Sequence, residues 1–278
     1  MARPANWPIF GGLAAAAVTL LATTGHACGP ETDCMIGDRT FRIAMPPGAE
    51  IDGSQAGLGA IVFLHGYRGS ADGAMQNATL RKVAEDLGIA FVAAKSGGED
   101  WLIRNAPNSG FVDDRAELDY FDALLERLAE FGIDRDKTLV TGFSAGGMMT
   151  WTLACRRPDQ FAAFVPVAGT FWAPMPEDCP YEPINLLHIH GTSDTIVPLG
   201  GRPIADVHQG DVPDALDGLR EALGIDRAEA TADGPEGLRC TGSGDAQQGS
   251  VTFCLHDGGH SFQSPWVDWS YRALVGGS

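Results

Sequence analysis

The amino-acid sequence predicts an α/β fold in which a mostly parallel central sheet carries helices on both faces. Residues 60–64 and 89–94 are continuously apolar, as strands buried on both faces are expected to be. Segments with apolar residues at helical spacing separate these and later strands, so strands and helices alternate along the chain. Because no internal repeat or long linker divides the sequence, we expect residues 28–278 to form one domain.

In the first half of the chain, one helix connects the two apolar strands and a second helix follows them. Residues 40–45 alternate as an outer strand, which stops at Pro46. The first helix is expected to end at Gly88, since glycine adopts the left-handed conformation that often closes helices. The second is expected to begin at residues 113–114, because acids favour a helix N-terminus, and to end at Gly132. The buried stripes of these helices are Leu80, Val83 and Leu87, and then Leu118, Phe121, Leu125 and Leu128.

The second half continues the alternation around a strand that begins near Lys137. A helix follows that strand and is stopped by Pro158, and an aromatic, proline-rich connection surrounds Phe171. Residues 226–249 are rich in Gly and Asp, a composition typical of turns and loops. The remaining strands are predicted at residues 161–167, 184–189 and 251–255, and the remaining helices at residues 212–223 and 266–274.

The composition disfavours two classes of partner. The chain carries 19 Lys and Arg against 36 Asp and Glu, a formal net charge of −17 at pH 7. So acidic a chain is not expected to bind nucleic acid or other anionic polymers. The sequence also contains no C-x-x-C motif or closely spaced His/Cys pair, so we expect no zinc or other metal site.

The N-terminal residues 1–27 have the pattern of a cleaved signal peptide. Arg3 supplies a short basic region, residues 9–22 form an apolar, alanine-rich core, and residues 25–27 form a small-x-small cleavage site. Because this apolar run is too short to span a bilayer comfortably, we expect no stable membrane insertion. The protein is therefore expected to be secreted or periplasmic, with lipidation of Cys28 as the alternative.

All six cysteines follow the predicted cleavage site. An even number of cysteines in an exported chain is typical of disulfide bonds rather than metal ligands. Six cysteines allow fifteen connectivities. Proximity in sequence favours the pairs Cys28–Cys34, Cys155–Cys179 and Cys240–Cys254.

A glycine-flanked serine between a predicted strand and a predicted helix is the strongest candidate for chemistry. Gly142, Ser144 and Gly146 fit the G-x-S-x-G nucleophile elbow of α/β-hydrolases. A Cβ at either glycine would collide with the backbone of so tight a turn, which lifts the serine hydroxyl over the end of the sheet. We predict that Ser144 is a nucleophile; an ordinary loop serine is the alternative.

A serine nucleophile needs a base and a carboxylate that orients the base. Asp194 follows the predicted strand at residues 184–189, on the edge where parallel strands end. His260 lies in a glycine-flanked loop after the last strand. The order Ser, Asp, His is that of α/β-hydrolases, so we predict Asp194 as the orienting carboxylate and His260 as the base. A turn aspartate and a solvated histidine are the alternatives, and Asp257 is a competing carboxylate.

The oxyanion of an acyl transfer needs hydrogen-bond donors that are aimed in advance. We predict that the backbone N–H groups of Ala145, directly after the nucleophile, and of Tyr67, in the loop after residues 60–64, are these donors. The side chain of His65 is interpreted as a structural partner inside that loop.

Four further aromatic side chains could belong to the core or to the site. His188 and His190 lie on a predicted buried strand and are interpreted as satisfied core histidines. Trp101 and Trp172 lie in irregular stretches beside the expected active edge. They are candidates for the wall of a substrate pocket, with simple packing as the equal alternative.

Four motifs together carry a resemblance to a known family. They are Leu64-His-Gly-Tyr67, Thr141-Gly-Phe-Ser-Ala-Gly-Gly-Met148, His190-Gly-Thr-Ser-Asp-Thr-Ile-Val-Pro198 and Gly258-Gly-His260. The chain resembles polyhydroxybutyrate-depolymerase-type esterases, which are similar to the feruloyl and acetylxylan esterases of the same α/β-hydrolase branch. The resemblance implies an α/β-hydrolase fold, the Ser144–Asp194–His260 triad and hydrolysis of carboxylic esters without a cofactor, outside the cytoplasm.

The sequence therefore predicts a secreted serine esterase that acts through an acyl-enzyme. The expected substrate is a small ester or oligoester, either a hydroxyalkanoate oligomer or polyester or a feruloyl- or acetyl-type ester. The alternatives are a serine peptidase of the same fold and an inactive binding protein with a hydrolase fold. The oligomeric state is left open.

Overall fold

The computed structural model describes Met1 and residues 28–50, 56–107, 114–177, 179, 182–226, 231–232, 234–235, 237–245 and 249–276. Apart from Met1, the predicted signal peptide therefore lies outside the described residues, as does Asp113. The main sheet contains β1 (Cys34–Ile36), β2 (Arg39–Ala44), β3 (Leu58–Leu64), β4 (Ala90–Ala94), β5 (Ile133–Phe143), β6 (Ala163–Val167), β8 (Asn185–Gly191), β11 (Thr231–Ala232), β12 (Leu238–Asp245) and β13 (Gly249–His256). The helices are α1 (Ala71–Met75), α2 (Ala78–Leu87), α3 (Arg115–Glu130), α4 (Ala145–Arg156), α5 (Val212–Leu223) and α6 (Ser264–Leu274).

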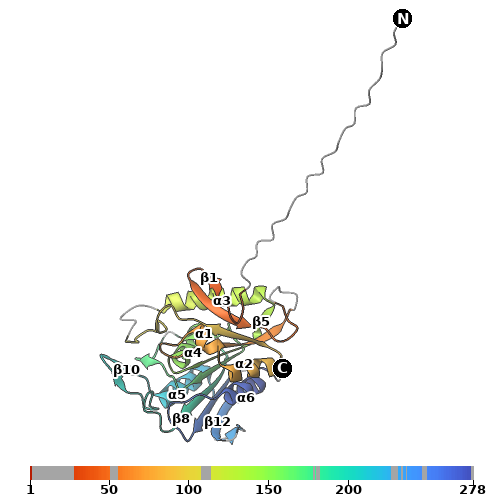
Figure 1. The fold of residues 1–278 in the computed structure, drawn as a ribbon. Helices are drawn as coiled ribbons and strands as arrows, with labels where there is room; N and C mark the ends of the chain where they lie inside the picture. Colours follow the sequence, from red (N-terminus) through yellow and green to blue (C-terminus); the bar gives the residue numbers. More distant parts are fainter. Residues whose placement is uncertain are drawn as a thin grey trace.

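The main sheet is parallel in its centre and antiparallel at its margins. Its ten strands lie in the order β1-β2-β4-β3-β5-β6-β8-β13-β12-β11 (Figure 1). The six strands from β4 to β13 in this order pair in parallel. The pairs β1–β2, β2–β4, β12–β13 and β11–β12 are antiparallel. The predicted mostly parallel sheet is confirmed.

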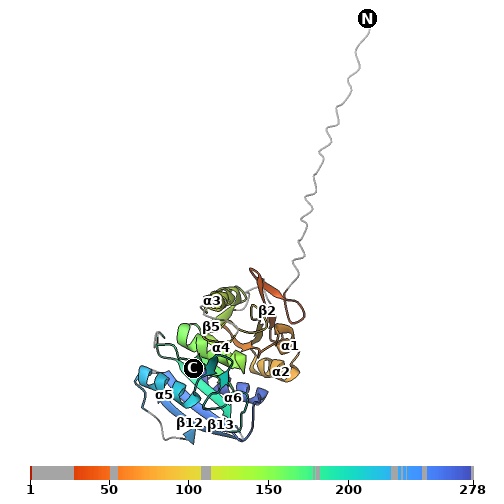
Figure 2. The same ribbon diagram turned by 90° about the vertical axis from the view of Figure 1, so that its left-hand side faces the viewer.

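Helices cover both faces of the sheet, as the sequence predicts. Along β3, Ala60, Val62 and Leu64 join one hydrophobic core and Ile61 and Phe63 join the other, because successive side chains of a strand point to opposite faces. The first core also contains residues of α3, α4 and α5, and the second contains residues of α1, α2 and α6. Figure 2 shows the two groups of helices with the strands between them. Within the described part of the chain, no helix has the length and apolar character needed to cross a membrane.

Two parts of the topology differ from the sequence prediction. Within the Gly/Asp-rich residues 226–249, β12 forms a long antiparallel pair with β13. In addition, β7 (Trp172–Ala173), β9 (Pro203–Ile204) and β10 (Val207–Gln209) form a separate three-stranded sheet in the order β7-β10-β9. The pairing of β7 with β10 joins distant segments, and β12 and β13 form a hairpin whose first strand is rich in Gly and Asp, so local composition is a weak guide to both features.

Three disulfides link Cys28 to Cys34, Cys155 to Cys179 and Cys240 to Cys254, which are the pairs that proximity in sequence favours. The first closes a small loop before β1. The second ties the last turn of α4 to the connection after β7. The third joins β12 and β13 at directly paired positions.

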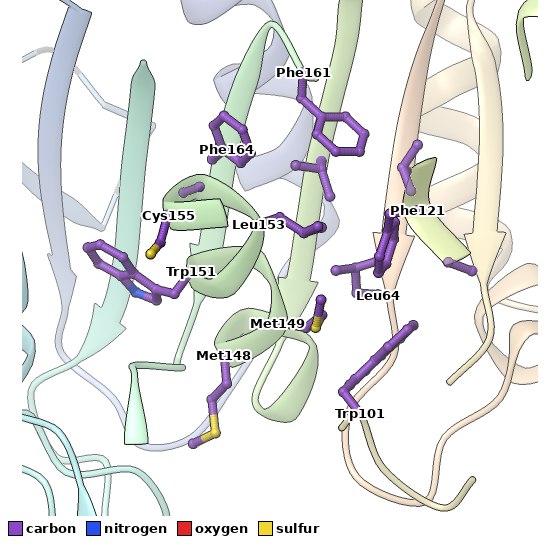
Figure 3. Packing of buried hydrophobic residues seen from close by; sticks show 14 of the residues in the cluster. Leu64, Trp101, Phe121, Met148, Met149, Trp151, Leu153, Cys155, Phe161 and Phe164 are labelled. Atoms are coloured by element: carbon purple, nitrogen blue, oxygen red, sulfur yellow. The ribbon is translucent and has the colours of Figure 1, made fainter. Parts of the chain in front are cut away.

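Helix α4 lies in the middle of the first core, and this burial fixes its position. All its residues from Ala145 to Cys155 are buried. Figure 3 shows the labelled side chains Met149, Trp151 and Leu153 leaving this helix in different directions among other apolar residues. Because α4 begins directly after β5, Ser144 at their junction is held in place by the packing of the core.

Candidate active site

Ser144 occupies a strained turn between β5 and α4. Its φ of 57° and ψ of −118° are an unusual backbone conformation for a residue with a Cβ. The neighbouring glycines make the turn possible. A Cβ on Gly142 would lie 2.3 Å from the Gly146 carbonyl oxygen, and a Cβ on Gly146 would lie 2.0 Å from the Leu64 carbonyl oxygen. The local geometry is therefore that of a nucleophile elbow.

The Ser144 hydroxyl is not used to cap the helix that follows it. Ser144 is the N-cap residue of α4, a position where serine side chains commonly accept a backbone hydrogen bond, yet no such bond forms. Across the described residues, its Oγ has no hydrogen-bond partner. No hydrogen bond from the described residues therefore ties down the hydroxyl, while the backbone N–H of Ser144 donates to the Val167 carbonyl at 3.0 Å.

Asp194 and His260 lie 66 residues apart in sequence and are joined by a short hydrogen bond. His260 Nδ1 lies 2.7 Å from Asp194 Oδ2, and because a carboxylate only accepts, Nδ1 carries the proton. The Asp194 side chain is fully buried, and its Oδ1 accepts the N–H groups of Ile196 and Val197 at 2.8 and 2.9 Å. The carboxylate is thus fixed, and Nε2 of His260 is left as the nitrogen that can accept a proton.

The imidazole of His260 lies against the residue that precedes Ser144. The ring centroids of Phe143 and His260 are 4.6 Å apart, and the His260 side chain keeps 16% of its exposure. The loop that carries His260 packs directly on the loop that carries Asp194. A Cβ on Gly191 would lie only 2.3 Å from the Gly259 carbonyl oxygen. The three predicted triad residues therefore converge on the same edge of the sheet.

The competing groups in this region are used elsewhere. Asp257 forms an exposed ion pair with Arg239, with an Nη2–Oδ1 distance of 2.8 Å. His256 packs against Trp266, with ring centroids 4.9 Å apart, and burial lowers the pKa of its imidazole. Among the residues described here, neither is hydrogen-bonded to His260.

A directed chain of hydrogen bonds runs through the core behind Asp194. The Trp151 indole donates to His188 Nδ1 at 3.1 Å, and His188 Nε2 lies 2.8 Å from His190 Nδ1. His190 Nε2 in turn lies 2.7 Å from the Val197 carbonyl oxygen. Because an indole only donates, each histidine must be neutral and donate from Nε2. This chain supports the turn that holds Asp194, and burial lowers the pKa of both histidines, so the prediction of satisfied core histidines is confirmed.

The loop after β3 is braced from inside by His65. Its Nδ1 donates to the Gly66 carbonyl at 2.8 Å, and its Nε2 accepts the Ser96 N–H at 3.2 Å. Burial lowers the pKa of His65 to about 4, so the ring stays neutral. The prediction that His65 is a structural partner rather than a second base is confirmed.

The two predicted oxyanion donors lie close to Ser144. Ala145 is the first residue of α4, so its N–H has no acceptor within the helix and lies at the positive end of the helix dipole. Tyr67 follows Gly66, where a Cβ would lie 3.6 Å from Ser144 Cβ. In the described structure, the Tyr67 N–H makes no hydrogen bond. Both groups are therefore available to a developing negative charge, as an oxyanion hole requires.

The candidate role of Trp101 in the substrate pocket is wrong. Trp101 is fully buried, and its indole donates to the His65 carbonyl at 2.8 Å. Figure 3 shows it beside Leu64 and Phe121, inside the core. The sequence places Trp101 in an irregular stretch but does not say which way the ring points. It supports the loop that carries Tyr67 and does not contact the pocket.

A pocket of about 370 Å³ opens at Ser144, within the size range of ligand sites. Ala145, Tyr67 and Trp172 line it. Met148, Asp100, Ile196, Arg202 and Gln209 also line it, and no sequence pattern indicated that these residues belong to the pocket. No group of three or more His, Cys, Asp or Glu side chains in the described residues is arranged to hold a metal ion.

Asp100 makes the stability of the protein depend on pH. Burial raises the pKa of its carboxyl to about 6, above the value in an unfolded chain. The folded protein therefore binds this proton more tightly than the unfolded chain does. Above pH 6 the ionised carboxylate lowers the free energy of unfolding, and this destabilisation disappears as the pH falls toward 4. Asp100→Asn keeps an oxygen for the Trp101 N–H, which Asp100 Oδ1 accepts at 2.9 Å.

We expect Asp100→Asn to raise the free energy of unfolding by about 1 kcal/mol at pH 8, a value discounted for the partial exposure of the carboxyl. The gain should largely disappear near pH 4. Urea unfolding of both proteins at the two pH values measures the difference. An equal gain at both pH values, or none at pH 8, would contradict this account.

Comparisons with known proteins agree with the fold. A family model described as phospholipase/carboxylesterase matches residues 51–206. The protein named "Putative esterase NocK" from Nocardia uniformis subsp. tsuyamanensis is 30% identical over 260 residues, which cover 86% of this chain and 74% of that protein. Feruloyl esterase C from Emericella nidulans is 32% identical over 111 residues, which span 39% of this chain and about 40% of the length of that protein.

Solved structures show the same fold at lower identity. An acetyl xylan esterase from Aspergillus awamori superimposes with a TM-score of 0.60 and 16% sequence identity, over 86% of this chain and 94% of that one. At such identity the likeness establishes the architecture alone. Together with the match of the family model, it shows that the chain belongs to the phospholipase/carboxylesterase family of α/β-hydrolases.

Proposed function

We propose that this protein is a serine carboxylesterase in which Ser144 is the nucleophile, His260 the base and Asp194 the carboxylate that orients the base. One observation carries the proposal. A fully buried Asp194 side chain accepts a hydrogen bond from Nδ1–H of His260 at 2.7 Å, beside a serine held in a strained elbow. Membership in a family of carboxylesterases supports the reaction type.

The proposed reaction has two halves. His260 Nε2 takes the proton of Ser144 Oγ as the oxygen attacks the ester carbonyl, and the N–H groups of Tyr67 and Ala145 stabilise the oxyanion. The alcohol then leaves with the proton from His260, which produces an acyl-enzyme on Ser144. Water, activated by the same imidazole, releases the acid and restores the serine. Asp194 holds the imidazole in the reactive tautomer and stabilises its charged form.

The relatives narrow the substrate class to carboxylic esters. Their names describe an esterase and a feruloyl esterase. Together with the motif resemblance, they favour small esters or oligoesters of hydroxyalkanoate, feruloyl or acetyl type. No feature of the site requires a cofactor for this chemistry, since serine, histidine and two backbone N–H groups supply every step.

Export from the cytoplasm is part of the proposal. Three disulfides are typical of proteins from oxidising compartments and fit a secreted or periplasmic enzyme. Cys28 is paired with Cys34, so its sulfur is not available for a thioether-linked lipid. The alternative of a lipidated Cys28 is therefore disfavoured.

A matched pair of substrates tests the proposed function. We expect p-nitrophenyl butyrate to be hydrolysed with a kcat/KM at least about 10³-fold above that of the p-nitroanilide of butyrate, because an ester with a p-nitrophenolate leaving group is intrinsically far more reactive than an anilide and a serine esterase adds no amide-specific contacts. Comparable rates on both would favour a serine peptidase. Failure to hydrolyse any of a panel of short-chain, hydroxybutyrate, feruloyl and acetyl esters would favour a binding protein.

A further inference from the structure

One wall of the Ser144 pocket carries a buried amide without a partner. Gln209 is only 3% exposed and lines the pocket, yet its Oε1 accepts no hydrogen bond from the described groups. A buried polar atom left unpaired destabilises the fold, so such atoms in native structures call for an explanation. Other side chains share this feature among the described residues, but of these Gln209 alone lines the pocket at Ser144.

The backbone around Gln209 holds the amide in place. Gln209 pairs with Trp172 across β10 and β7, and its N–H donates to the Arg202 carbonyl at 2.9 Å. A Cβ on Gly201 would lie 2.0 Å from the Gln209 carbonyl oxygen, so the two segments are in close contact. The unpartnered amide is therefore presented by a small sheet and not by a free loop, which favours specific recognition.

A second polar group lies on the same wall. Arg202 lines the pocket, and its Nε donates to the Ile196 carbonyl at 2.8 Å. Its terminal Nη atoms form no ion pair with any described residue. The lining also contains apolar side chains, among them Met148, Trp172 and Ile204. A ligand that fits must therefore combine carbon surface with an oxygen placed at Gln209 and Arg202.

The pocket is on the acyl side of the proposed reaction. It is lined by Ser144 and by both proposed oxyanion donors, but His260 is not part of its lining. The leaving alcohol receives its proton from His260, so the alcohol lies toward that side chain and the acyl group extends into the pocket. An acetyl group would fill only a small part of about 370 Å³, so a larger acyl group fits better.

We propose that Gln209, assisted by Arg202, is a specificity-determining residue that selects esters whose acyl group carries a hydroxyl. A hydroxyl can donate to Gln209 Oε1 while its oxygen accepts from Gln209 Nε2 or from an Nη atom of Arg202, so it gives the buried Oε1 the donor that it lacks. A site built to bind a hydroxyl rejects the analogue without it, because the oxygen of Gln209 then stays buried and unpaired. This inference rests on the proposed function and goes beyond it.

Two pairs of esters that differ by one hydroxyl test the proposal. They are p-nitrophenyl 3-hydroxybutyrate against p-nitrophenyl butyrate, and methyl 4-hydroxycinnamate against methyl cinnamate. In at least one pair, we expect the kcat/KM of the wild-type protein to be about 10-fold or more higher for the hydroxylated ester. Equal values within both pairs would overturn the proposal, and this measurement needs no variant.

The variant Gln209→Met keeps the length of the side chain and removes its polar atoms. We expect it to lower kcat/KM for the preferred hydroxylated ester about 10-fold relative to the ester without the hydroxyl, so that the preference disappears. Gln160→Met is the matched control, because Gln160 also carries an unpartnered buried Oε1 but lies away from Ser144. It should keep the wild-type preference.

A preference that survives in Gln209→Met would also overturn the proposal. This outcome is distinguishable from a failure of the proposed function. If Gln209 does not contribute to specificity, the wild-type protein still hydrolyses all four esters, and Gln209→Met shows the same preference as the wild type. If the proposed function is wrong, none of the four esters is hydrolysed.

Discussion

Ser144→Ala is expected to reduce the kcat for p-nitrophenyl butyrate by at least about 10⁵-fold. The variant lacks the oxygen that forms the acyl-enzyme. Folding should be unaffected. Alanine has the same Cβ as serine and so tolerates the φ of 57° equally, and the Ser144 Oγ makes no hydrogen bond with the described residues.

The control for this prediction is Ser193→Ala. Ser193 is exposed on the loop that carries Asp194, so its removal should leave kcat and the melting temperature near the wild-type values. Stopped-flow or plate assays of p-nitrophenol release, with melting curves for both variants, provide the measurement. Substantial turnover by a folded Ser144→Ala protein would remove Ser144 as the nucleophile.

Asp194→Asn is expected to lower kcat by about 10⁴-fold with a smaller change in KM. The asparagine oxygen can still accept the N–H groups of Ile196 and Val197, which leaves an NH₂ group facing His260 Nδ1. An NH₂ group only donates, so Nδ1 must become the acceptor and the proton moves to Nε2. The imidazole then cannot take the proton of Ser144. The same NH₂ group also meets His190 Nε2, 3.5 Å from Asp194 Oδ2, so some loss of stability is expected.

Asp257→Asn separates this effect from a general change of charge near the base. Asp257 lies only three residues before His260 in sequence, but its carboxylate pairs with Arg239 at the surface. Asp257→Asn makes the same chemical change as Asp194→Asn. If Asp194 is the orienting residue, the kcat of Asp257→Asn should stay within about twofold of the wild-type value. A large loss in Asp257→Asn with little change in Asp194→Asn would reverse the assignment of the carboxylate.

The elements that place the candidate triad could be predicted because they are encoded locally. Uninterrupted apolar runs mark the buried strands, and the glycines around Ser144 mark a turn that excludes a Cβ. Asp194 and His260 each follow a strand of the parallel part of the sheet. Since the carboxyl ends of parallel strands share one edge, the order along the chain was enough to expect them together.

The lining of the pocket could not be predicted in the same way. Trp101 and Trp172 both lie in irregular stretches of sequence, but one points into the core and the other into the pocket. Gln209 reaches the pocket because β10 pairs with β7, and nothing local to residues 207–209 indicates that partner. Side-chain direction and pairing between distant segments are properties of the folded chain, which explains why the reaction type is easier to infer than the substrate.

The intact mass of the protein after treatment with a fluorophosphonate tests the central claim most directly. If Ser144 is activated by His260 and Asp194, the wild-type protein gains the mass of one phosphonyl group, and peptide mapping places it on Ser144. The Ser144→Ala protein gains nothing, and Asp194→Asn reacts far more slowly. A wild-type protein that stays unmodified, or a label found on another residue, would contradict the account.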